Sequence, residues 1–582
     1  MPQRQSYWID ALTPTVVVAG SLPALLAYNI PPSSTLLNQA LALFGWGCVL
    51  SVATVALGIQ SPQRNAGLAS LLAAFAVLIA AALISPLWTH QPFGLALSNS
   101  GVLAAAVMLT LGAAAAHGAG RTNELFGALC SAMLLAGVCS VAVGIVQVFV
   151  PDWADGELIA QSGLAGRAAG NLRQPNHLST LLLWSAVAAA WLAEAKALRR
   201  AGAAALFALL VFGVALSASR TGLVGVAVLT LWGALDRRLE RRTRLLLLLS
   251  PALYAASWLG LSAWAHLGQQ VFGGEARLSS EGALNTTRFA IWSNTMELIK
   301  QHPWTGVGFG EFNFAWTLTP FPDRPVEFFD HAHNLPLHLA AELGIPLAAA
   351  VIALLAHALW RTFATSRAAA GLEATTLRAA FMMVLMMALH SQLEYPLWYA
   401  YFLLPTALAF GLCLGRPPGS APSATTTTPS RTRPLLVAGM LVIAGGFATV
   451  LDYMRVVAIF EPPEDAAPLA ERIAHGQHSW LFAHHADYAA ATIAEHPSEV
   501  MDTFKRAPHY LLDARLMLAW AKALDESGDT QRARHVAQRL REFRHPSAKE
   551  FFAPCETNSA APKAEPYQCT APTAKLDYRD FR

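Results

Sequence analysis

The chain has 582 residues, of which 54% are hydrophobic and 13% are charged. Soluble domains carry roughly 25% charged residues, so this composition excludes a wholly soluble fold. The formal net charge is only +3, and no basic run alternates with aromatic residues, which argues against binding of nucleic acid. Residues 1–150 contain five charged side chains, whereas residues 461–582 contain 33. We therefore expect a long membrane domain followed by a soluble domain.

Thirteen apolar stretches approach the length of about 20 residues that a helix needs to cross a bilayer. They lie at residues 13–30, 36–58, 66–88, 95–117, 123–150, 176–194, 201–218, 220–235, 245–266, 335–360, 377–394, 397–415 and 435–453. The predicted fold class is therefore all-α, a polytopic membrane protein with about 13 transmembrane helices. More spans follow the first stretch, so we interpret it as a membrane helix and not as a cleaved signal peptide.

The distribution of positive charge between these stretches predicts the orientation of the chain. With the N-terminus in the cytoplasm, the cytoplasmic connections together with Arg4 hold 17 Lys and Arg residues. The short connections on the other side hold only Arg167, Arg173 and Arg220, and the long connection at 267–334 adds four. Because cations are retained on the cytoplasmic side, we expect a bacterial inner-membrane protein whose C-terminal domain is periplasmic.

This topology divides the chain into segments of different character. They are N-terminal spans at 1–150, a membrane core at 151–415 that includes the periplasmic loop 267–334, a cytoplasmic linker at 416–434, a last span at 435–453 and a periplasmic helical domain at 454–582. The linker is rich in Pro, Ser and Thr. In the tail, helices predicted at 514–527 and 530–543 flank Gly528-Asp529, which is typical of a tetratricopeptide-like hairpin. Generic helical packing is the alternative.

The six cysteines follow the same division. Four lie in apolar stretches, where they are most simply small core residues. Cys555 and Cys569 lie in the polar tail, and in an oxidising periplasm they are expected to form a disulfide that closes a short loop. Two free thiols are the alternative. No cysteine pattern indicates a zinc site, and no cofactor is expected.

The strongest candidate for chemistry is the run Asp330-His331-Ala332-His333-Asn334, just before the predicted span at 335–360. Histidine is the side chain best suited to accept a proton near neutral pH, and the following Asn can hydrogen-bond a sugar. Two histidines at i and i+2 are also found in metal sites, but no Cys or acidic cluster completes one here. A purely structural role for both histidines is the other alternative.

Two segments with arginines are expected on the same side of the membrane. Ser217–Gly222 contains Arg220 between hydroxyl side chains, and a planar guanidinium suits a diphosphate; snorkelling to the interface is the alternative. Residues 167–177 precede a membrane helix whose first N–H groups attract anions; a polar connection capped by Asn176 is the alternative. The candidate residues of this second segment are Arg167, Arg173, Gln174 and Asn176.

Two further segments contain candidate functional residues. Arg288 and Trp292 are followed by a glycine run at 306–310, which is not a P-loop because the Lys-Ser/Thr ending is absent. We expect a tight turn there that returns the loop to the bilayer. In residues 390–399, Glu394 is a candidate partner for an arginine, and the neighbouring Tyr and Trp side chains fit an aromatic interfacial belt.

Together these features predict a cavity at the outer leaflet that contains a base and binds an anion. No Asp-x-Asp pair occurs in the chain, which disfavours a metal-clamped sugar nucleotide. A membrane-held diphosphate donor fits better, because arginines offset the charge that develops on a leaving diphosphate. A histidine can then deprotonate an incoming hydroxyl.

His333-Asn334, followed after nine residues by Gly344, resembles the signature of the O-antigen ligase/polymerase superfamily. Leu347 departs from the Gly, Thr or Tyr that often stands three positions after that glycine. The stretch from Arg288 to Gly308 is also similar to this superfamily. Gly170–Asn176, His390–Tyr399 and the periplasmic tail resemble one branch, the bacterial protein O-oligosaccharyltransferases of the PglL type, which glycosylate pilins.

This resemblance implies transfer of a preassembled glycan from undecaprenyl diphosphate to Ser or Thr of an exported, pilin-like protein. It implies that His333 is the essential histidine and that Arg220 and Arg288 lie near the diphosphate, without a metal. The expected substrate-binding residues are Arg167, Arg173, Gln174, Asn176, His331, Asn334 and Glu394.

Other functions stay open at this point. An O-antigen ligase acting on lipid A-core, or an O-antigen polymerase, would use the same chemistry on another acceptor. A flippase or transporter for lipid-linked glycans needs polar residues deep inside several spans, whereas the first five spans are nearly free of charge. A non-catalytic scaffold leaves the His and Arg clusters unexplained.

Overall fold

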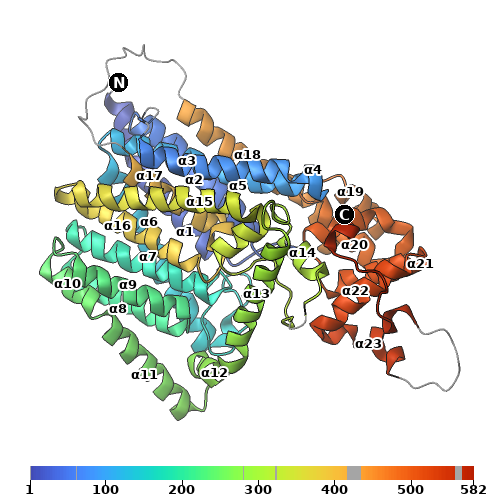
Figure 1. Ribbon diagram of the computed structural model, residues 1–582. Coiled ribbons are helices and arrows are strands. Elements are labelled where there is room, and N and C mark those ends of the chain that lie inside the picture. The colour runs from blue at the N-terminus through green and yellow to red at the C-terminus, as the bar shows by residue number, and fades with distance from the viewer. Residues whose placement is uncertain are drawn as a thin grey trace. The chain divides into compact units, whose positions relative to one another are not determined.

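The computed structural model describes residues 2–59, 62–63, 65–279, 281–321, 324–415, 434–556 and 566–582, without the side chains of 2–9, 278–279 and 281–287. These residues form helices and connections, and no strand occurs among them (Figure 1). The all-α prediction is therefore confirmed. The predicted linker, apart from Pro434, lies outside the described residues, as do four cations used for the orientation. These are Arg64, Arg416, Arg431 and Arg433.

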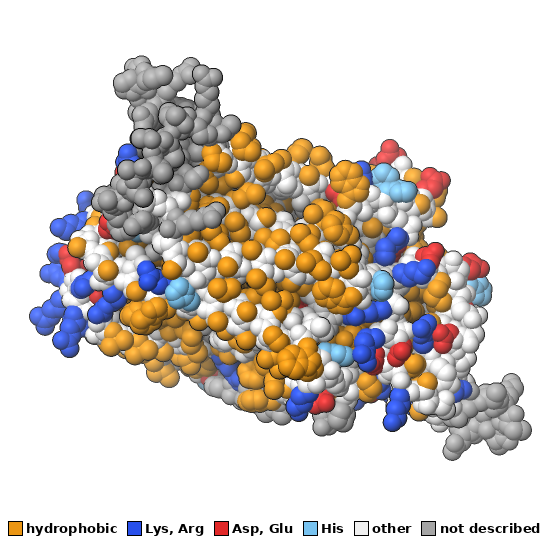
Figure 2. All heavy atoms as spheres, turned by 45° about the horizontal axis from the view of Figure 1, so that its top comes forward, with side chains coloured by type: hydrophobic (Ala, Val, Ile, Leu, Met, Phe, Trp, Pro, Cys, Tyr) orange, Lys and Arg blue, Asp and Glu red, His pale blue; other side chains and the backbone are white. Residues whose placement is uncertain are grey.

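Every predicted membrane stretch contains a helix in the structure. The helices are α1 (Pro2–Leu25), α2 (Leu36–Ala56), α3 (Ala66–Ile84), α4 (Pro86–Thr89), α5 (Phe93–Gly118), α6 (Thr122–Phe149), α7 (Pro175–Glu194), α8 (Arg200–Leu216), α9 (Arg220–Leu235), α10 (Arg241–Leu248), α11 (Ser250–Gly268), α15 (Leu335–Ala368), α16 (Gly371–His390), α17 (Ala400–Leu414) and α18 (Pro434–Phe460). Eight helical segments of the described chain are long and apolar enough to cross a membrane, and four more apolar helices are shorter. The count of 13 spans stays a prediction. On the face shown in Figure 2, hydrophobic side chains cover a broad area, as a lipid-facing surface requires.

The chain divides into two compact units, and the first comprises residues 1–75, 102–281 and 353–448. Its centre is α7, which is buried from Pro175 to Leu192 and packs against α6, α8, α9 and α16. Small residues allow this close approach. A Cβ at Gly137 would lie 2.3 Å from Ser185 Oγ, and one at Gly225 would lie 2.1 Å from a methyl of Leu183.

The second unit comprises residues 76–101, 282–352 and 449–582. The predicted loop 267–334 is largely helical: it contains α12 (Gly273–Ser279) in the first unit, and α13 (Glu281–Gln301) and α14 (Phe312–Leu318) in the second. α14 is buried along its whole length. The tail adds α19 (Leu469–Gly476), α20 (Ala483–Ile493), α21 (Ala514–Glu526), α22 (Thr530–Phe543) and α23 (Lys549–Phe552).

The tail helices are fastened to α14 by buried polar contacts. His509 Nδ1 lies 2.8 Å from Glu311 Oε1, and both side chains are almost fully buried. His535 Nε2 lies 2.7 Å from the carbonyl of Leu318. Arg324 contacts Glu542 at 3.2 Å and stacks on Trp316 and Phe543. The helices predicted at 514–527 and 530–543 are present as α21 and α22, whereas their tetratricopeptide-like character stays a prediction.

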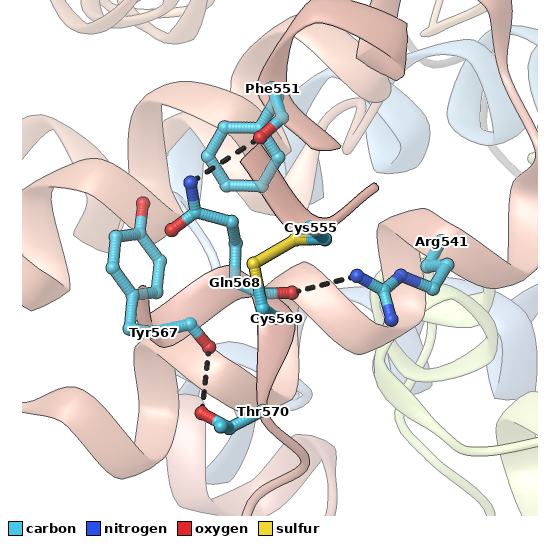
Figure 3. The surroundings of a disulfide bond; sticks show 7 residues. All are labelled: Arg541, Phe551, Cys555, Tyr567, Gln568, Cys569 and Thr570. Carbon is cyan, nitrogen blue, oxygen red and sulfur yellow. Dashed lines mark hydrogen bonds between the residues drawn. A yellow bond between two sulfur atoms is a disulfide. The ribbon is translucent and has the colours of Figure 1, made fainter. Parts of the chain in front are cut away.

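The predicted disulfide between Cys555 and Cys569 is present (Figure 3). Its two ends are held to the tail by neighbouring contacts. Arg541 donates to the Gln568 carbonyl at 3.1 Å, and Gln568 donates through its amide to the Phe551 carbonyl at 3.3 Å. The other four cysteines are free.

Candidate functional site

The segment with the strongest sequence signal forms the start of α15. Asn334 caps this helix, because its Oδ1 accepts a hydrogen bond from the Leu337 N–H at 3.0 Å. His333, one residue earlier, has a φ of 50°, a left-handed conformation that non-glycine residues adopt rarely and that is found preferentially at functional sites. The ring of His333 packs edge-on against Phe329, with 5.3 Å between centroids.

The peptide groups of Ala332, between the two histidines, are held from both sides. Ala332 is fully buried, so its polar backbone groups need partners inside the protein. Trp292 Nε1 of α13 donates to the Ala332 carbonyl at 3.0 Å, and the Ala332 N–H donates to His338 Nδ1 of α15 at 3.4 Å. Two side chains from two helices therefore hold the backbone that carries His333; we call this pair of contacts the Ala332 clamp.

The tautomer of His338 follows from the same contacts. Because Nδ1 accepts a hydrogen bond, the proton lies on Nε2, and Nε2 is 3.3 Å from Glu342 Oε1. Glu342 also accepts from the N–H of Phe312 at 3.4 Å, which joins α15 to the start of α14. Both His338 and Glu342 are 3% exposed, so water has little access to the contact between their side chains.

His331 differs from His333 in its surroundings. Its ring stacks on His338 with 4.9 Å between centroids, and its Nδ1 lies 3.0 Å from Asp330 Oδ1. Burial lowers the pKa of His331, although the neighbouring Asp330 opposes the shift. Burial by itself would raise the pKa of Asp330, but the charge and hydrogen bond of His331 outweigh it and lower that pKa. His331 is thus held between an acid and a second imidazole.

Arg288 belongs to the same unit as His333. It lies on α13 four residues before Trp292, and residues four apart share one face of a helix. Since Trp292 reaches the Ala332 carbonyl from this face, Arg288 lies on the side of α13 that faces the histidine segment.

The start of α9 repeats the backbone form seen at α15. Ala218 has a φ of 49°, and Ser219 caps the helix by accepting from the Gly222 N–H at 3.1 Å. Arg220 is the first residue of α9. As at α15, a left-handed residue is followed by a capping side chain and then by the helix, whose first N–H groups carry partial positive charge.

Two guanidinium groups converge on this turn. Arg167 donates to the carbonyls of Ser217 at 3.2 Å and Ala218 at 3.4 Å, and Arg277 donates to the Ala218 carbonyl at 2.9 Å. Burial, together with the charge of Arg277, lowers the pKa of Arg167 to about 10. Arg277 was missed by the sequence reasoning, which counted it only as a loop cation. It reaches the turn because the Gly273 N–H at the start of α12 donates to the Gly166 carbonyl, a contact that no local pattern encodes.

The start of α7 shows the same form a third time. Arg173 has a φ of 56°, and Gln174 caps α7 by accepting from the His177 N–H at 2.8 Å. The alternative in which Asn176 caps this helix is therefore wrong, because Pro175 occupies the first helical position and the cap lies on the residue before it. Arg173 donates to the carbonyls of Ala27 and Ser34, and burial lowers its pKa.

Asn176 connects three of the predicted segments. Its Nδ2 donates to Glu394 Oε1 at 2.9 Å, and its Oδ1 accepts from Ser219 Oγ at 2.6 Å. Ser179 Oγ in turn donates to Ser219 Oγ at 3.0 Å. These groups are all buried, so the segments around residues 176, 219 and 394 form one hydrogen-bonded cluster.

The predicted site residues thus fall into two groups. In the first unit lie Arg167, Arg173, Gln174, Asn176, Arg220 and Glu394, and in the second lie Arg288, His331, His333 and Asn334. Within the part of the chain that the structure describes, His, Cys, Asp and Glu side chains do not gather in threes that could hold a metal ion.

Three family models match parts of the chain between residues 168 and 556. A model described as "O-Antigen ligase" matches residues 205–352, and "Virulence factor membrane-bound polymerase, C-terminal" matches 378–556. "Protein glycosylation ligase" matches 168–193, which includes the start of α7. The predicted resemblance to the O-antigen ligase/polymerase superfamily is confirmed.

Curated relatives point to the predicted branch. The "General O-oligosaccharyltransferase" of Acinetobacter baylyi is 28% identical over 284 residues, 48% of this chain and 49% of that protein. The "ComP-specific O-oligosaccharyltransferase" of the same species is 24% identical over 261 residues, 43% of this chain and 44% of that protein. The chain spans about half the length of the curated relatives it matches. The resemblance to protein O-oligosaccharyltransferases is thereby confirmed as well.

Proposed function

We propose that the protein is an O-oligosaccharyltransferase of a bacterial inner membrane. It moves a preassembled glycan en bloc from undecaprenyl diphosphate to Ser or Thr hydroxyls of an exported, pilin-like protein. The N-terminus lies in the cytoplasm, and residues 454–582 lie in the periplasm with the loop 267–334. The observation that carries the proposal is the Ala332 clamp, because it holds the backbone beside His333 in a left-handed conformation at a capped helix start.

In this mechanism His333 is the general base. Its imidazole removes the proton from the acceptor hydroxyl, the oxygen attacks the anomeric carbon, and the bond from that carbon to the diphosphate oxygen breaks. Undecaprenyl diphosphate leaves with the bonding electron pair, and no metal takes part. Arg220 and Arg288 bind the diphosphate, with Arg167 or Arg173 close by, and stabilise the charge that develops on it.

The remaining predicted residues bind the substrates. His331 and Asn334 flank the base, and we assign them to contacts with sugar and acceptor. Gln174, Asn176 and Glu394 organise the diphosphate side. The support for this group is the hydrogen-bonded cluster that joins Asn176 to Glu394 and to the Ser219 cap of α9, where Arg220 begins the helix.

The decisive experiment supplies the purified full-length protein with a lipid-linked glycan and candidate acceptors, in buffer that contains a chelator. A mass increase on a pilin-like protein is expected. His333→Ala should abolish it, while His496→Ala, a change at an exposed tail histidine, should leave it intact. Full transfer by His333→Ala would defeat the assignment of the base, and loss of transfer on chelation would contradict metal independence.

The second candidate is an O-antigen ligase or polymerase, which the matches over 205–352 and 378–556 favour. Both use the same donor, so the acceptor distinguishes them. Transfer to lipid A-core, or extension of the glycan itself, with no modified protein would establish this alternative.

A further inference from the structure

An exposed tryptophan lies near the start of the tail, which follows α18. Trp480 belongs to the turn between α19 and α20, and 80% of its surface is exposed. Transfer of an indole from water to an apolar surrounding is favourable, and an exposed indole that belongs to a larger apolar patch marks an interaction surface.

The turn around Trp480 is firmly built. Asp452 of α18 is 8% exposed, and its carboxylate accepts from Ser479 Oγ at 2.7 Å and from the N–H groups of Trp480 at 3.2 Å and Leu481 at 2.9 Å. Arg455, one turn further along α18, donates to the same carboxylate and to the His478 carbonyl. These bonds fix the backbone of the turn from which the indole projects.

The same turn lies directly on the start of α5. A Cβ at Gly94, the second residue of α5, would lie 2.3 Å from the Trp480 carbonyl oxygen and 3.2 Å from Leu481 Cα. Only glycine permits this approach. α5 and α18 are both candidate membrane spans, so the Trp480 turn is positioned by the start of α5 and by Asp452 near the end of α18.

The surroundings of Trp480 have the composition of a membrane interface. Exposed apolar side chains lie on α4, on the start of α5 and on the end of α18. They are Leu87 (80% exposed), Trp88 (43%), Phe93 (59%), Leu451 (56%) and Met454 (46%). The guanidinium of Arg455 lies 6.0 Å from the Trp480 ring. Aromatic side chains with a cation beside them are typical of the headgroup region of a bilayer.

We propose that the Trp480 turn is a lipid-interface anchor. The indoles of Trp480 and Trp88 and the ring of Phe93 lie in the headgroup layer, where Arg455 supplies charge for anionic phosphates. The continuity of this surface with the candidate spans favours lipid over a protein partner as its occupant. The anchor holds the tail on the membrane surface whatever reaction the protein catalyses.

The test uses the full chain in liposomes that contain phosphatidylglycerol. The free cysteines at 48, 130, 139 and 413 are replaced by alanine, and Trp480→Cys is labelled with an environment-sensitive fluorophore. Lipids with a shallow nitroxide should quench it at least twofold, and iodide should have little effect. Lys522→Cys, on the exposed side of α21, is the matched site and should show the reverse. Quenching of position 480 by iodide alone, or its protection only after a protein partner is added, would overturn the proposal.

A second measurement removes the influence of the fluorophore. Hydrogen exchange of residues 477–483 is compared between wild type and Trp480→Ser in the same liposomes, with α21 as the internal reference. We expect at least threefold faster exchange at 477–483 in the variant and none of this increase in α21. Equal rates at 477–483 would contradict the anchor.

Discussion

The starts of α9 and α15 share a backbone form but are stabilised in opposite ways. At α15, the indole of Trp292 and the imidazole of His338 bond the backbone of Ala332. At α9, the backbone carbonyls of the turn accept from the charged side chains of Arg167 and Arg277. The first arrangement fixes geometry without adding charge, whereas the second concentrates positive charge as it fixes geometry. Substitutions at the two places should therefore fail differently.

The largest effect is expected at the turn before α9, residues 217–219, which accepts from Arg167 and Arg277; we call it the charged turn. Under the proposed function, Arg277→Ala should lower kcat/KM for the lipid-linked donor about 100-fold, since about 2.7 kcal/mol is typical of a lost charge-assisted contact. The acceptor KM should stay within about twofold. Arg238→Ala is the control, because Arg238, like Arg277, donates to the backbone of the first unit, here to the carbonyls of Arg367 and Ala369. An equal loss in both variants would show a structural effect alone.

A smaller effect is expected at the Ala332 clamp. Trp292→Phe keeps an aromatic ring but removes the hydrogen bond to the Ala332 carbonyl, so kcat should fall about tenfold, or about 1.4 kcal/mol, with little change in either KM. Trp184→Phe is the control, because Trp184 Nε1 donates in the same way to the Met383 carbonyl at 3.0 Å.

His338→Asn and His338→Ala extend this test. The Asn oxygen can replace Nδ1 as the acceptor for the Ala332 N–H, so Asn should retain more activity than Ala.

If Trp292→Phe raised a KM and left kcat unchanged, the clamp would not position the base. If no variant and no wild-type protein transferred glycan, exchange protection of the 328–335 peptide would still report whether the clamp holds.

The sequence predicted features that depend on local pattern. Apolar length gave the helices of the membrane domain, and amphipathic spacing gave α21 and α22. The alternative that had Asn176 as the cap of α7 lies two residues late, because Pro175 favours the first helical turn and Gln174 precedes it. Arg277 lies 59 residues from the Ala218 carbonyl that it bonds, and Trp292 lies 40 residues from Ala332. Contacts across such separations leave no periodicity in the chain, so the clamp and the charged turn required coordinates.

The smallest effect concerns the tail, where the buried His535 donates through Nε2 to the Leu318 carbonyl. Burial lowers the pKa of His535 to about 4, and the Leu318 carbonyl opposes that shift. The unfolded tail, with an ordinary histidine pKa near 6.5, therefore binds more protons than the folded tail between pH 6.5 and 4, and stability should fall as pH falls through that window. The loss attributable to His535 from pH 7 to 5.5 is about 1 kcal/mol. It is measured as exchange of the α22 amides in the full-length protein, corrected for intrinsic rates. His535→Gln can still donate to the Leu318 carbonyl but does not titrate, so its profile should be flatter by that amount; an identical slope in both proteins would assign the acid sensitivity to other groups.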